Sequence, residues 1–153
     1  MGSEAGRALF VGAGTLLAAL AMLTWQTVRI PGHAPHRVVA ELRLAQAAAV
    51  LLAFSAAFVA GLGASAPGPA AALDMACAVL VVGVALMTLV RDPRAALAWI
   101  AAAFLGRAIL DLSHLLGWLP RVAVDPVLTG SLLANLGAAG CCTLPLLRTP
   151  TPR

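Results

Sequence analysis

The stretch ALFVGAGTLLAALAMLTWQTV, residues 8–28, decides the fold class because it contains no charged residue. A helix needs roughly 20 apolar residues to cross a hydrocarbon core about 30 Å thick, and this stretch is long enough. It is also long for the apolar region of a signal peptide, and Trp25 lies near its end, where an interfacial anchor is expected. We therefore predict a retained transmembrane helix here.

The composition of the whole chain agrees with a membrane protein. Of its 153 residues, 61% are hydrophobic and 10% are charged, and the mean hydropathy is +0.97. An average soluble domain is about a quarter charged, so this composition argues against a water-soluble fold. The net charge of +4 comes from arginines that lie singly or in pairs around apolar stretches. Nucleic-acid-binding proteins instead carry a basic patch or stripe, so we expect no nucleic-acid partner.

Clusters of Gly, Pro and polar residues divide the chain into apolar stretches, because such clusters end helices. The breaks are Ile30–His33, Gly63–Pro69, Arg91–Pro93 and Pro120–Pro126. The implied spans cover residues 8–29, 38–63, 70–90, 95–119 and 126–147. The pattern predicts an all-α membrane protein, a bundle of about five transmembrane helices, with residues 1–153 as a single polytopic domain.

The distribution of arginine predicts the orientation, because short loops rich in Lys and Arg stay on the cytoplasmic side. With five spans, seven arginines fall on one side: Arg29, Arg37, Arg43, Arg91, Arg94, Arg148 and Arg153. Only Arg7 and Arg121 fall on the other side. We therefore expect the N-terminus outside and the C-terminus in the cytoplasm. Together with the Ala-, Leu- and Arg-rich usage, this favours a multi-pass protein of a bacterial cytoplasmic (inner) membrane.

Three ionisable residues lie inside the fourth span, where a charged group near the helix centre costs about 2.5 to 3.5 kcal/mol on insertion scales. They are Arg107, Asp111 and His114, and their i, i+4, i+7 spacing places them on one helical face. At i, i+4, Arg107 and Asp111 can form an ion pair within the helix, and this partial neutralisation makes insertion plausible.

Other polar residues are expected at a similar depth, since a helix rises 1.5 Å per residue and the spans alternate in direction. Asp74 of the third span should lie level with His114, and Asn135 of the fifth should lie near Asp111. The same count adds Thr15, Ser55 and Cys77, so that every span contributes to one polar layer.

Two interpretations of the cluster Asp74, Arg107, Asp111, His114 and Asn135 stay open. It is either a buried structural network that fixes helix register, or a binding site or proton relay. In the second case Arg107 neutralises one carboxylate, the other carboxylate takes up a proton, and His114 relays protons to the outer face.

Polar residues elsewhere favour simpler interpretations. Glu41 and Arg43 lie in the first turns of the second span, where we expect them to reach the headgroups. His33 and His36 lie in a loop without Cys or carboxylate neighbours, so they do not define a metal site.

The cysteines favour packing over chemistry. Cys77 and the pair Cys141 and Cys142 lie at different depths, which argues against a disulfide, and no CxxC motif is present. With Gly137 and Gly140, the two adjacent thiols give the fifth helix a small-residue face suited to close helix contact.

No phosphate-binding loop, nucleophile motif or zinc-ligand pattern is present, so enzyme activity is disfavoured and no cofactor is expected. Two functions remain. The first is a non-enzymatic subunit or assembly partner of a larger membrane complex, favoured by small size and scarce loops. The second is a homo-oligomeric, proton-coupled carrier of a small solute or ion. The expected partners are the lipid bilayer and other membrane subunits or further copies of this chain.

Overall fold

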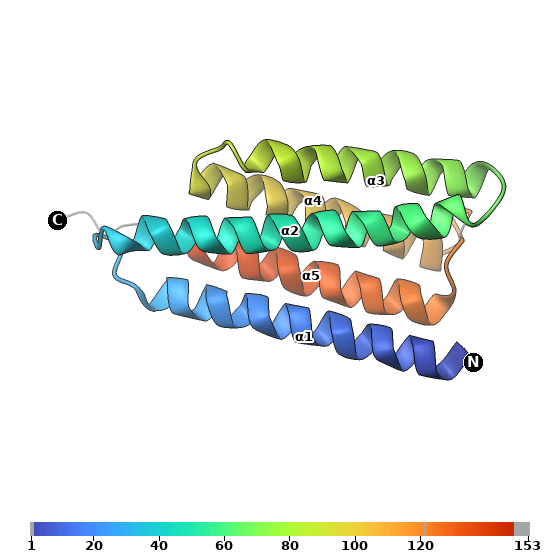
Figure 1. Ribbon diagram of the computed structural model, residues 1–153, viewed down its shortest axis with the longest axis horizontal. Helices are drawn as coiled ribbons and strands as arrows, with labels where there is room; N and C mark the ends of the chain where they lie inside the picture. The colour runs from blue at the N-terminus through green and yellow to red at the C-terminus, as the bar shows by residue number, and fades with distance from the viewer. Residues whose placement is uncertain (1, 121, 149–153) are drawn as a thin grey trace.

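The computed structural model describes residues 2–120 and 122–148, and this part of the chain forms five α-helices and no strand (Figure 1). The helices are α1 (Gly2–Arg29), α2 (His36–Ala64), α3 (Pro69–Thr88), α4 (Pro93–Leu115) and α5 (Asp125–Leu147). Each is long and apolar enough to cross a membrane. The prediction of an all-helical chain with five helices that are long and apolar enough to span a membrane is therefore confirmed for the described residues.

The helix ends have local causes. The carboxylate of Asp92 caps α4 by accepting hydrogen bonds from the backbone N–H groups of Arg94 and Ala95, at 3.2 and 3.0 Å. Pro93 follows as the first helical residue, where its missing N–H costs nothing. α4 ends at Leu115, four residues before the predicted end at 119, because the chain turns through Gly117 with φ of +74°.

The helices alternate in direction along the bundle (Figure 1). α1, α3 and α5 run one way, and α2 and α4 run the other way, so the connections α1–α2 and α3–α4 lie at one end. α4 contacts α2, α3 and α5 and has the largest buried share of any of these helices. α3 packs only on α2 and α4, whereas α1 packs on α5 and α2. The helix with the ionisable residues is therefore the most buried of the five, although Leu105 and Ile109 on its outer face are exposed.

An apolar core fills the bundle from the α1–α2 end to its middle. The largest fully buried apolar side chains are Phe104, Leu44, Leu52, Leu97 and Ile100. Buried alanines lie between them and let the helix backbones approach closely. The polar cluster lies beyond this core, toward the α2–α3 and α4–α5 connections.

α1 and α5 run in parallel and pack through glycine. A Cβ on Gly137 would lie 2.8 Å from Leu17 Cδ2, so only a glycine leaves room for this leucine in its present position. Further along, the Thr24 hydroxyl donates a hydrogen bond of 3.2 Å to the carbonyl of Cys141. That carbonyl lacks a helical partner because Pro145, four residues later, has no N–H.

The small-residue face predicted on α5 is confirmed only in part. Cys141 and Cys142 are buried and Gly137 is half-buried against Leu17, but Gly140 is exposed and an added Cβ would contact nothing within 4 Å. A helix turns about 100° per residue, so Cys141 shares the side of Gly137 that faces α1, and Gly140 does not.

Replacing Gly137 by leucine should therefore destabilise the protein by about 1 to 3 kcal/mol through overpacking against Leu17. The matched control is Gly140→Leu, the same substitution at the open position three residues along α5. Thermal unfolding in detergent measures both variants. Equal melting temperatures for the two would contradict the packing that we describe.

Candidate functional site

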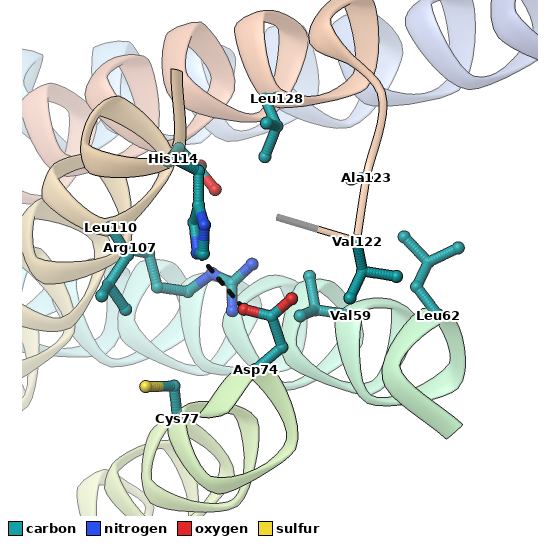
Figure 2. Close-up of a pocket in the computed structure, with 11 residues that line it drawn as sticks. Val59, Leu62, Asp74, Cys77, Arg107, Leu110, His114, Val122, Ala123 and Leu128 are labelled. Atoms are coloured by element: carbon teal, nitrogen blue, oxygen red, sulfur yellow. Dashed lines mark ion pairs between the residues drawn. The ribbon is translucent and has the colours of Figure 1, made fainter. Parts of the chain in front are cut away.

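The polar cluster centres on a contact between His114 of α4 and Asp74 of α3, which is an ion pair when His114 is protonated. His114 Nε2 lies 3.3 Å from Asp74 Oδ1, and the side chains are 5% and 18% exposed. Figure 2 shows the imidazole and the carboxylate pointing toward one another from the two helices. The predicted common depth of Asp74 and His114 thus corresponds to a direct contact.

Asp111 is held by α5. Its Oδ2 atom accepts a hydrogen bond of 2.7 Å from the Ser131 hydroxyl and one of 2.8 Å from the Asn135 side-chain amide. The same amide donates to Ser131 Oγ at 3.2 Å. Ser131 was not among the predicted site residues, although its position four residues before Asn135 places it on the same face of α5. Asn135 is confirmed as a neighbour of Asp111.

Arg107 differs from the sequence-based expectation. Its side chain is buried, but it forms neither a hydrogen bond nor an ion pair with the described residues, and its Nε atom has no partner. The predicted ion pair with Asp111 is therefore wrong. The physical reason is that Ser131 and Asn135 hold the Asp111 carboxylate toward α5. Asp111 and Asp74 still interact with Arg107 electrostatically through space.

A cavity of about 40 Å³ joins these groups. Its polar lining consists of Asp74, Cys77, Arg107, Asp111 and His114, and Figure 2 shows Val59 and Leu62 of α2 and Val122 of the α4–α5 connection around it. Among the described residues, two buried nitrogen atoms of its lining have no hydrogen-bond partner, Arg107 Nε and His114 Nδ1. A polar cavity of this volume is large enough for one or a few water molecules, which can bond to such atoms.

The predicted layer with one polar group from every span is wrong for α1. Thr15 is exposed, and its hydroxyl bonds to the carbonyl of Val11 in its own helix. Ser55 of α2 is half-buried and likewise bonds within its helix, to Leu52. Cys77 does line the cavity. The ionisable groups come from α3 and α4, with hydrogen-bond partners from α5.

A second buried ion pair lies at the opposite end of the bundle, where the sequence predicted side chains that reach the headgroups. Glu41 is buried, and its Oε1 lies 2.9 Å from Arg37 Nε. The Arg37 guanidinium also donates to the carbonyls of Ile30, Pro145 and Arg148 at 3.2 to 3.4 Å. The expectation for Glu41 is therefore wrong, because free carbonyls at the end of α5 draw Arg37 inward and Glu41 neutralises it. Arg43 is exposed, as expected.

The other candidate ligands do not come together in the part of the chain that the structure describes. His33 and His36 are exposed, and no group of three His, Cys, Asp or Glu side chains is arranged to hold a metal ion. Cys77, Cys141 and Cys142 are free thiols.

Comparisons with known proteins found no matching family model, no matching curated protein and no matching solved structure.

The hydrogen bonds to Asp111 predict how much stability the protein loses when Asn135 is replaced. Asn135→Leu should lower the free energy of unfolding by about 1.5 to 3 kcal/mol, the usual contribution of a hydrogen bond to a charged group. The control is Thr129→Val on the same helix, where an exposed hydroxyl bonds only to the backbone of α5. Thermal unfolding compares the two variants. If Asn135→Leu loses no more stability than Thr129→Val, the bond to Asp111 does not stabilise the bundle.

Proposed function

We propose that this chain is a non-enzymatic subunit of a larger membrane complex and that the Asp74–His114 pair exchanges protons with water at one membrane face. The observation that carries the proposal is this ion pair at 3.3 Å, beside a cavity that also contacts Arg107 and Asp111. Ionisable groups inside membrane spans commonly mark proton relays or solute pathways.

The charges of the cluster suit a single exchangeable proton. With Asp74 and Asp111 ionised, the carboxylates contribute two negative charges, Arg107 contributes one positive charge, and a proton on His114 makes the cluster neutral. A neutral cluster is favoured in low dielectric, because each uncompensated charge there is expensive. Histidine is the side chain that most readily gains and loses a proton near neutral pH. His114 Nε2 faces Asp74, which leaves Nδ1 for a water molecule that delivers or removes the proton.

The packing of the rest of the bundle favours a subunit over a complete pathway. The core residues Leu52, Ile100 and Phe104 are buried on the inner side of the cluster, and they offer no polar group to carry a proton further. A partner that supplies further polar groups would complete the route. The second candidate is a homo-oligomeric, proton-coupled carrier of a small solute or ion. In this case other copies of the chain supply the rest of the pathway lining. Proton flux through proteoliposomes that contain this chain alone would favour the carrier.

Infrared difference spectra test the proton exchange directly. We start from a variant in which the exposed His33 and His36 are glutamine, so that His114 is the remaining histidine. When the pH is lowered, its imidazole bands should change together with a carboxylate band, because the proton is shared between the two side chains. Asp74→Asn should remove the linked carboxylate change, because the imidazole then faces an amide.

The control for this variant is Asp92→Asn, which removes a carboxylate at the other end of α4 and keeps a good N-cap residue. Its spectrum should match that of the starting variant. Imidazole bands that do not change with pH, or a linked carboxylate change that persists in Asp74→Asn, would exclude the proposed exchange.

The orientation belongs to the same proposal, with the N-terminus outside and the C-terminus in the cytoplasm of a bacterial inner membrane. Arg29, Arg37, Arg43, Arg91, Arg94 and Arg148 lie toward the end that holds the α1–α2 and α3–α4 connections. Arg121 and Arg153 fall outside the described residues. The positive-inside rule then places the cavity on the outer side.

An alkaline phosphatase fusion after Arg153 should therefore be inactive, since this enzyme folds only outside the cytoplasm. A fusion in the α4–α5 connection should be active. The reverse pattern would show that the orientation is inverted and that the cavity opens to the cytoplasm.

A further inference from the structure

An apolar groove runs along the surface between α1 and α2, away from the polar cavity. Its volume is about 380 Å³, and it is open on its outer side. Leu16, Leu20 and Leu23 form one wall. Val50, Leu51 and Phe54 form the other wall. The two helices contribute apolar side chains almost exclusively, so the occupant of the groove must be apolar along its length.

The groove has a polar end. α1 and α2 are antiparallel, and Leu16 and Phe54 mark one end of the groove while Leu23 and Ala47 mark the other. Beyond this second end follow Gln26 on α1 and Arg43 on α2, both exposed. Arg43 lies seven and eleven positions before Val50 and Phe54, which places it on the groove face of α2.

The length of α2 indicates that the side chain of Arg43 reaches the headgroups. At 1.5 Å per residue, the 29 residues of α2 extend over about 43 Å, which exceeds a hydrocarbon core about 30 Å thick. Arg43 is seven residues, or roughly 10 Å, from the start of this helix at His36. A centred α2 extends about 7 Å beyond the core at each end, so the backbone of Arg43 lies just inside the hydrocarbon boundary and its long side chain extends back to the headgroups. The apolar lining from Ala47 onward then lies within the hydrocarbon region.

We propose that this groove binds an anionic phospholipid, with one acyl chain between α1 and α2 and the phosphate on Arg43. The groove extends from Leu16 to Leu23, or roughly 10 Å, which is too short for a transmembrane helix of a partner but suits part of an acyl chain. The planar guanidinium of arginine matches a phosphate group with two parallel hydrogen bonds. The site is separate from the proposed proton exchange and does not depend on it.

Native mass spectrometry of the purified protein with added phosphatidylglycerol or phosphatidylcholine tests the site. The wild-type protein should retain phosphatidylglycerol about fivefold better, the factor expected for one arginine beside an anionic lipid. Arg43→Gln should retain the two lipids equally. Ala19→Phe, which fills the groove from an exposed position on α1, should lose both.

The matched control is Arg91→Gln, which removes an exposed arginine at the same end of the bundle but in the α3–α4 turn. It should keep the preference for phosphatidylglycerol. A preference that persists in Arg43→Gln, or equal retention by the wild-type protein, overturns the proposal. A dimer that Ala19→Phe abolishes without any change in lipid retention would instead assign the groove to a second copy of the chain.

Discussion

The cost of ionisable groups inside a membrane governs the architecture of this protein. Arg107, Asp111 and His114 all lie on α4, and none of them is tolerable against lipid tails. The face of α4 that carries them is therefore covered by α2, α3 and α5, and each of the three side chains is buried, whereas Leu105 and Ile109 on the opposite face are exposed. The other helices then follow: α3 supplies Asp74 to His114, and α5 supplies Ser131 and Asn135 to Asp111.

The two ends of the bundle use charge in different ways. At the α1–α2 end, arginine side chains satisfy backbone carbonyls that a helix leaves free at its C-terminus. Arg94 donates to the carbonyl of Leu146 at 3.2 Å, and Arg148 donates to that of Val28 at 2.9 Å. The guanidinium donors of these arginines bond to helix ends and thereby hold neighbouring helices together. At the cavity end, by contrast, Arg107 Nε has no hydrogen-bond partner among the described residues, so it is available to a water molecule in the cavity.

The sequence predicts correctly those features that depend on local composition and on position along a helix, and it fails where helix rotation matters. Helix number and span limits depend on local composition, and the structure confirms them within a few residues apart from the early end of α4 and the N-terminal extension of α1. The depth of a residue along the bundle follows from the rise per residue of a helix. This calculation correctly placed Asp74 beside His114 and Asn135 beside Asp111. Depth alone does not identify neighbours, as Thr15 shows. This residue lies on the side of α1 that faces away from the bundle, and it is exposed.

The sequence by itself determined that five apolar helices form and that a few ionisable residues lie within one of them, because hydropathy and helical periodicity are local properties. Only the tertiary structure decided which partners these residues take. Asp111 bonds to α5 instead of Arg107, and Glu41 is drawn inside by Arg37, since both outcomes depend on donors and free carbonyls of helices distant in sequence. Such contacts are set by helix rotation and packing, which depth and spacing along one chain do not specify.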